Sequence, residues 1–171
     1  MHTIRSATVE DADALATLCL MVQQLHVARR PDVFAAVDHV TLSDWFRSRL
    51  TEKETRSWLA EETGTAVGYA YATFNERPAN PFTHHLRWLE IVQLGVRPDH
   101  RRSGIARALV DAAIAEADTR GLRDIRIRAW SFNDDAQRTF TRLGFVPRTM
   151  EYGMHRSRQL SPDTSRTIPM P

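Results

Sequence analysis

The segment from residue 86 to residue 130 constrains the fold more than any other part of the chain. Leu86–Val96 contains an apolar strand, Gly104–Arg120 has the apolar spacing of one helix face, and Asp124–Trp130 resembles a further strand. Gly121 stands directly after the helix, where a C-capping glycine is usual. Two strands joined by one helix predict a parallel pair with a right-handed crossover.

The flanking segments predict further elements around this unit. We expect strands at 3–8, 56–61, 66–75 and 146–154, and helices from Val9 to about Ala28, at 42–50 with Ser43 or Asp44 near its cap, and at 136–143. The resulting order, β-α-α-β-β-β-α-β-α-β, predicts an α/β domain with a mixed sheet. We expect one domain over residues 1–156, followed at 157–171 by a flexible tail rich in Ser, Pro, Thr and Arg.

Composition narrows the function classes. No apolar run approaches the ~20 residues of a membrane helix, and the first residues lack the apolar core of a secretory signal. Cys19 is the only cysteine and lies on an apolar helix face, so we expect a buried thiol, no disulfide and a cytoplasmic location. The pI of about 9.1 arises because Lys53 is the only lysine and the other basic residues are arginines, at a net charge of only +2. We therefore expect no nucleic-acid or membrane partner.

His84, His85 and His100 lack metal-ligand spacing, so no metal site is predicted.

The turn and helix start at 101–107 are the strongest candidate for a binding site. A helix N-terminus carries unpaired N–H groups and partial positive charge, and the small residues Gly104 and Ala106 would let a phosphate approach the backbone. The arginines of the same segment add positive charge. The G-x-x-x-x-G-K-[ST] and G-x-G-x-x-G phosphate loops are both absent from the sequence. From the residues alone, a plain turn with surface arginines is an equal alternative.

Two motifs resemble those of a known enzyme family. Residues 101–106, with the sequence RRSGIA, resemble the Q/R-x-x-G-x-G/A acyl-CoA signature of the GNAT family of N-acetyltransferases. Residues 133–145 resemble the family's N-x-x-A-x-x-x-Y-x-x-x-G-F pattern, with Phe140 in place of the tyrosine. The resemblance covers about residues 3–155. It implies an α/β fold of the GNAT type, with a mixed central sheet of six to seven strands, a splayed parallel pair and about four helices.

The resemblance also implies acetyl-CoA as co-substrate. The pantetheine would pair with the edge of the strand that ends near Val96, and the pyrophosphate would lie on the turn that follows. The implied cofactor-binding residues are Leu94, Gly95, Val96, Arg101, Arg102, Ser103, Gly104, Ile105, Ala106, Arg107, Asn133 and Phe140. The backbone N–H of Leu94 or Gly95 is expected to stabilise the oxyanion that forms during acetyl transfer.

Glu90 is the predicted general base. Counting back from the basic turn, it lies where some members of the family carry a base glutamate. Alternation along the strand would place Glu90 on the same face as Val92, Leu94 and Val96, away from Gln93. Burial among such neighbours would raise the pKa of the carboxyl group toward working pH. An exposed glutamate at a strand end is the alternative.

The general acid is less well defined, because phenylalanine at position 140 cannot donate a proton. The alternatives are unassisted departure of the thiolate, a water molecule, or a hydroxyl from Tyr152 or Ser131. Tyr152 is the side chain that we predict, and simple packing in the last strand is its alternative role.

The segment between the first two helices is expected to form one wall of the acceptor site. His26, Asp32 and Phe34 are the predicted substrate contacts, and Asp32 or Asp38 could attract a cationic amine. Solvated loop charges are the alternative. We expect transfer of an acetyl group to a primary amine of a small molecule by direct attack. A protein lysine or N-terminal acetyltransferase, acting on a peptide, and a non-catalytic acyl-CoA-binding domain are the alternatives. Members of this fold often form homodimers.

Overall fold

Four helices and five strands make up residues 2–154, which are the residues that the computed structural model describes. The strands are β1 (Thr3–Ser6), β2 (Thr55–Glu62), β3 (Thr65–Arg77), β4 (Leu86–Val96) and β5 (Ile125–Ile127). The helices are α1 (Ala12–Arg29), α2 (His39–Arg49), α3 (Ile105–Thr119) and α4 (Asp134–Leu143), with short 3-10 turns η1 (Val9–Asp11) and η2 (Pro98–His100). The expected tail at 157–171 lies outside the described residues.

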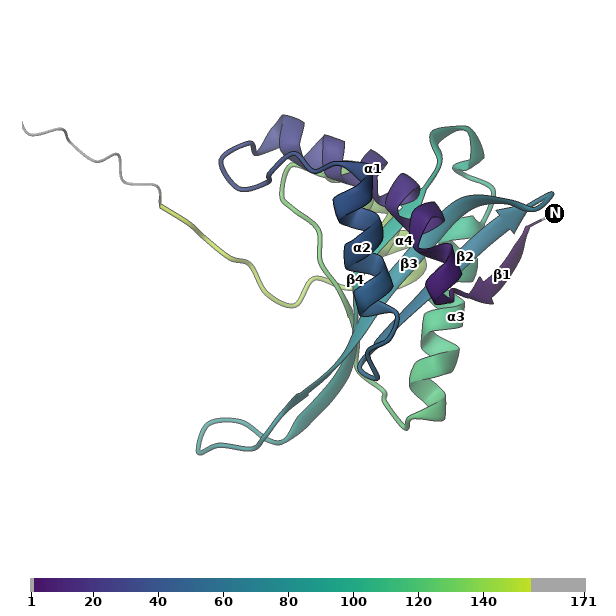
Figure 1. Cartoon of the computed structure of the whole chain (residues 1–171). Helices are drawn as coiled ribbons and strands as arrows, with labels where there is room; N and C mark the ends of the chain where they lie inside the picture. Colours follow the sequence, from purple (N-terminus) through teal and green to yellow (C-terminus); the bar gives the residue numbers. More distant parts are fainter. Residues whose placement is uncertain (1, 155–171) are drawn as a thin grey trace, which may run out of the picture.

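The strands lie side by side in chain order, from β1 to β5, and β1 to β4 can be followed in Figure 1. Neighbouring strands from β1 to β4 are antiparallel. The last pair, β4 and β5, is parallel, and α3 forms the crossover between the two strands. The parallel pair predicted from the 86–130 segment is therefore confirmed.

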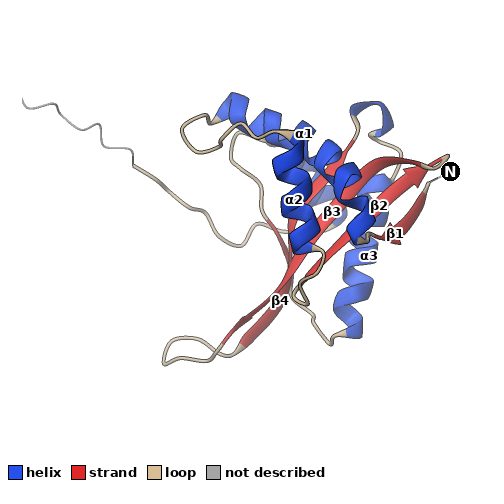
Figure 2. Ribbon diagram, in the orientation of Figure 1, coloured by secondary structure: helices blue, strands red, loops and turns tan. Residues whose placement is uncertain are grey.

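Helices cover both faces of the sheet. α1 and α2 lie across the face that points toward the viewer in Figure 2, and they bury a core that includes Phe46 and Tyr69. α3 covers the opposite face, where Ile105 and Leu109 are buried. Cys19 is buried in the core under α1, as predicted. Within residues 2–154, no helix is both long and apolar enough to cross a bilayer.

The predicted strand at 146–154 is absent, so the sheet has five strands and not six to seven. This segment instead leaves the sheet without secondary structure (Figure 1). Val146 and Tyr152 are exposed in it, and Pro147 lacks the N–H that a central strand needs. Because β5 is only three residues long, its outer edge offers few pairing positions to a further strand.

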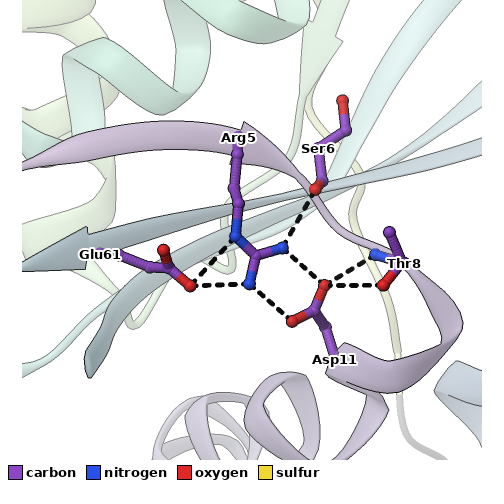
Figure 3. Close-up of polar contacts among 5 residues, drawn as sticks. All are labelled: Arg5, Ser6, Thr8, Asp11 and Glu61. Atoms are coloured by element: carbon purple, nitrogen blue, oxygen red, sulfur yellow. Dashed lines mark hydrogen bonds and ion pairs between the residues drawn. The ribbon is translucent and has the colours of Figure 1, made fainter. Parts of the chain in front are cut away.

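An arginine fixes the corner between β1, β2 and η1. Arg5 donates to the two carboxylate oxygens of Asp11 at 2.7 Å each and to Glu61 on β2 at 2.7 Å (Figure 3). Asp11 also accepts the backbone N–H of Thr8 at 2.8 Å. The Arg5 guanidinium lowers the pKa of the Asp11 carboxyl to about 2. These contacts hold the start of α1, the helix that covers β4.

Candidate active site

The parallel strands β4 and β5 pair over a short length and then separate. Three residue pairs join them, the last being Ile91 with Ile127. β5 ends at this point, whereas β4 continues to Val96 and stays paired with β3 along its other edge. Within the described residues, the edge of β4 beyond Ile91 therefore has no strand beside it, as expected for a splayed pair.

A β-bulge interrupts β4 at Val92. Ile91 lies opposite Ala72 and Gln93 lies opposite Tyr71, so Val92 is an extra residue without a partner on β3. A single extra residue reverses which face the following side chains occupy.

The bulge changes the surroundings predicted for Glu90. Glu90 lies opposite Thr73 of β3, and Gln93 lies opposite Tyr71. These β3 residues are two positions apart, so Glu90 and Gln93 both lie on the face that α1 and α2 cover. Leu94 and Val96 project to the other face, where they pack against the core under α3. The prediction that Glu90 shares a face with Leu94 and Val96, away from Gln93, was wrong because it assumed unbroken alternation.

The backbone of β4 offers an N–H group to the open edge. The N–H of Arg97 donates to the carbonyl of Val67, 2.9 Å away across the β3 pairing. The N–H groups of successive strand residues point to opposite edges of the strand. The N–H of Gly95 therefore also points toward β3, whereas those of Leu94 and Val96 point to the edge of β4 beyond the end of β5. Of the two expected oxyanion donors, the strand geometry favours Leu94 over Gly95.

Gly95 provides space for a buried hydrogen-bond cluster. A Cβ at this position would lie 2.5 Å from Cε1 of Tyr69 and 3.0 Å from Cγ2 of Val22. The Tyr69 hydroxyl donates to Oε1 of Gln93 at 3.1 Å, and the Cys19 thiol lies 3.5 Å from the same oxygen. Burial raises the pKa of both Tyr69 and Cys19, so both groups stay protonated and act as structural donors.

The start of α3 has the unpaired amides that the sequence predicts. Gly104 is the N-cap residue, with a φ of 86°, no side-chain cap and no acidic residue in the first turn. The N–H groups of Gly104, Ile105 and Ala106 have no hydrogen-bond partner within the described residues. No atom lies within 4 Å of a Cβ built on Gly104, so the space above this helix end is open to a ligand.

The arginines around this turn differ in their availability. Arg101 donates through Nε to the carbonyl of the last β4 residue at 3.2 Å, and Arg107 donates to a carbonyl at the end of α4 at 2.9 Å. The Ser103 hydroxyl turns back onto η2. Arg102 is exposed, has a positive φ of 63° and has no hydrogen-bond or ion-pair partner among residues 2–154. Arg102 is therefore the arginine best placed to meet a phosphate.

The second motif forms the start and the end of α4. Asn133 is the N-cap residue, and its side-chain oxygen accepts the N–H of Ala136 at 3.1 Å. Gly144 ends the helix with a φ of 100°. Phe140 is half-buried and makes an edge contact with Phe145 at a centroid distance of 6.3 Å. The motif thus has a local structural role in addition to the cofactor contacts that the resemblance implies.

Glu90 has polar partners rather than the apolar surroundings predicted for it. Its Oε1 lies 2.9 Å from Nε of Arg128, and its Oε2 accepts the indole N–H of Trp88 at 3.4 Å. The Glu90 side chain is 13% exposed. The sequence did not single out Arg128, because nothing local marks a residue that will pair across the sheet. Trp88 lies two residues before Glu90 on β4, so strand alternation could have found it.

The structure does not bring Tyr152 to Glu90. Tyr152 is 88% exposed, and among residues 2–154 its one hydrogen-bond partner is the sulfur of Met150, at 3.4 Å. Ser131 lies in the loop between β5 and α4, where its carbonyl accepts from Gln137 at 3.1 Å. Tyr152 was predicted as the acid on the assumption of a final strand, which is absent.

Aromatic side chains join the two loops next to the separated strands. His26 stacks on Phe34 at a centroid distance of 4.7 Å, and Phe34 meets Trp130 edge-on at 5.2 Å. Phe132 stacks on Trp130 at 6.0 Å and meets the edge of His26 at 6.0 Å. Burial lowers the pKa of His26, so the imidazole is neutral at neutral pH. The predicted substrate residues His26 and Phe34 therefore lie together. Trp130 and Phe132 pack against them, and the sequence did not reveal these contacts.

The acidic residues of the same region have local partners. Asp32 pairs with Arg30 at 2.8 Å. Asp38 caps α2 by accepting the N–H of Thr41 at 2.7 Å, and this hydrogen bond lowers its pKa. Asp38, and not Ser43 or Asp44, is thus the cap of α2. Within the described residues, no three His, Cys, Asp or Glu side chains are grouped to hold a metal ion.

Comparison with known proteins gives a family match and similar folds. The model of the acetyltransferase (GNAT) family matches residues 20–145. The mycothiol acetyltransferase of Thermobispora bispora is 28% identical over 127 residues, which cover 68% of this chain and 41% of that protein. The chain thus spans less than half the length of this relative.

Solved structures show the same fold. A tetramutant of the BH1408 protein of Bacillus halodurans has a TM-score of 0.81 at 24% identity, over 89% of this chain and 99% of that one. An aminoglycoside N-acetyltransferase in complex with CoA has a TM-score of 0.70 at 20% identity, over 92% and 95% of the two chains. These likenesses concern the fold.

Proposed function

The chain belongs to the GNAT family of acetyltransferases, and on that premise we propose that it transfers an acetyl group from acetyl-CoA to a primary amine of a small molecule. One observation carries the proposal. The unpaired edge of β4 leads, through one short turn, to the uncapped N-terminus of α3. A hydrogen-bonding edge next to a helix N-terminus suits a ligand that has an amide-containing arm and a pyrophosphate.

The residues present fit acetyl-CoA, which supplies the activated acetyl thioester. The N–H groups of Gly104, Ile105 and Ala106 would receive the pyrophosphate, with Arg102 beside them. The open N–H of Leu94 would bind the pantetheine arm or the carbonyl oxygen of the acetyl group. Arg101 and Arg107 would act mainly by holding the turn and α4 in place.

Glu90 is the proposed base. It lies on β4 one residue before the strands separate, on the face toward α1 and α2. An ammonium that enters from this face would meet the Glu90 carboxylate, which removes a proton and frees the nitrogen lone pair for attack. Phe140 cannot donate a proton and Tyr152 is exposed, so the thiolate would depart unassisted or with a proton from water.

Two observations favour a small acceptor over a protein. Arg126 and Arg128 lie beside Glu90, so a lysine-rich peptide would meet like charges there. The aromatic cluster joins the α1–α2 loop to the β5–α4 loop, which would narrow the approach of an acceptor to Glu90.

A non-catalytic acyl-CoA-binding domain is the second candidate function, because Phe140 replaces the usual tyrosine.

The variant Glu90→Gln tests the proposal. General-base catalysis contributes about 100-fold to 10,000-fold, so we expect kcat at neutral pH to fall by at least about 100-fold, with affinity for acetyl-CoA changed less than about twofold. Glu54→Gln, on the turn before β2, is a control of the same chemistry and should retain activity. An unaltered pH–rate profile in Glu90→Gln would remove Glu90 as the base. Acetyl-CoA binding without transfer in the wild type would favour the non-catalytic domain.

A further inference from the structure

Glu90 already has a cationic partner, and this partner is what an incoming amine must replace. Arg128 contacts both carboxylate oxygens, with Nε 2.9 Å from Oε1 and Nη2 3.5 Å from Oε2. The Glu90 side chain is 13% exposed, whereas the Arg128 side chain is 84% exposed. The carboxylate is therefore enclosed, and the guanidinium lies on its solvent side.

Positive charge is in excess around this pair. Asp124 binds two guanidinium groups, from Arg126 at 2.7 Å and from Arg148 at 2.5 Å. Arg126 lies directly beside Glu90 in the parallel pairing. Three arginines thus share two carboxylates, and Arg128 has no other carboxylate partner among residues 2–154. If the ammonium of an acceptor displaced Arg128 from Glu90, the Arg128 guanidinium would be left without a carboxylate partner.

We propose that the acceptor is a zwitterion, an amino acid or a similar compound with a carboxylate a few bonds from its amine. The ammonium takes the place of the guanidinium at Glu90, and the acceptor carboxylate binds the released Arg128. This inference rests on the proposed function, because it takes Glu90 as the group that receives the amine. The exchange keeps every charge paired, whereas a polycation would add like charges to the site.

The position of Arg128 suits this second role. It follows β5 directly, at the start of the loop that also carries Trp130 and Phe132. A guanidinium released from Glu90 therefore stays near the site, because the chain position of Arg128 is fixed by the end of β5. Arginine binds a carboxylate through two parallel N–H donors, which fixes the orientation of the bound group.

Paired acceptors test the inference. The full chain is assayed by thiol release with acetyl-CoA, using each of the twenty L-amino acids, the matching carboxamides, and spermidine as a polycation. We expect the best free acid to exceed its carboxamide in kcat/KM by at least about tenfold, which corresponds to about 1.4 kcal/mol. Arg128→Gln should abolish this preference by lowering kcat/KM for the acid alone, and Arg128→Lys should retain part of it. Arg47→Gln, at an exposed arginine of α2 that pairs with Asp44, should leave the preference unchanged.

The outcomes separate the two levels of the argument. Equal or better transfer to the carboxamides or to spermidine overturns the inference and leaves the proposed acetyltransferase function in place. A rise in activity with every acceptor in Arg128→Gln also overturns it, because Arg128 would then only compete for Glu90. Absence of transfer to every amine contradicts the proposed function itself, and the inference fails with it. Thermal denaturation and acetyl-CoA calorimetry of each variant show whether it is folded.

Discussion

Gly95→Ala places one methyl group at the most crowded point of β4. The new Cβ would lie 2.5 Å from Cε1 of Tyr69, about 1 Å closer than ordinary carbon–carbon contact. The ring cannot move away easily, because it is fully buried and its hydroxyl is bonded to Gln93. Overpacking of this kind costs about 1–3 kcal/mol. For a chain of this length, the expected fall in Tm is about 2–12 °C.

The assay is thermal denaturation of Gly95→Ala beside wild type, together with acetyl-transfer kinetics. Because the methyl group displaces the Tyr69 ring, whose hydroxyl positions the Gln93 side chain on β4 next to the proposed site, kcat/KM should fall as well. Gly153→Ala is the matched control, since no atom lies within 4 Å of its Cβ and it lies outside the sheet. Replacing Tyr69 with leucine in the Gly95→Ala background should recover part of the Tm difference. An unchanged Tm and unchanged kinetics in Gly95→Ala would refute the contact between Tyr69 and Gly95.

Two further predictions concern α1 and the acceptor wall. The folded-state pKa of Asp11, about 2, lies below its ordinary value of 3.8, so its stabilisation is present above about pH 4 and is lost as the pH falls toward 2. Asp11→Asn should therefore lower the free energy of unfolding by about 1–2 kcal/mol at neutral pH. Urea titrations of wild type and Asp11→Asn should show this difference shrinking toward pH 2. A difference in stability that does not depend on pH would contradict the ion pair as its source. Trp130→Ala removes the ring that connects Phe34 to Phe132 and should raise KM for the acceptor by about tenfold with little change in KM for acetyl-CoA. The reverse pattern in steady-state kinetics would place Trp130 at the cofactor instead.

The elements of the sheet and the start of α3 were predictable because local patterns specify them. Apolar spacing marked α3, and Gly121 marked its end. The pattern of small residues after β4 predicted amides free of protein partners, and the N–H of Gly104 is unpaired within the described residues. These features depend on the chain nearby and on elementary backbone geometry.

The remaining features depend on partners far away in the sequence. The segment 146–154 has the side chains of a strand, but β5 offers it only three residues of edge. The residues around Val92 contain no local signal for a bulge. The bulge nevertheless puts Gln93 on the same face of the sheet as Glu90. The pairing of Glu90 with Arg128 likewise requires the parallel register of β4 and β5.

Calorimetric titration of acetyl-CoA into wild type and Gly104→Glu tests the central claim most directly. A glutamate here would extend into the open space above the α3 amides, where its bulk and charge would exclude a pyrophosphate. Gly121→Glu is the control, because Gly121 also has a positive φ and open surroundings but lies at the opposite end of α3. We expect tight binding to wild type and to Gly121→Glu, and a loss of at least about 100-fold, or about 2.7 kcal/mol, in Gly104→Glu. Equal affinity in all three proteins would contradict the assignment of the α3 N-terminus as the pyrophosphate site.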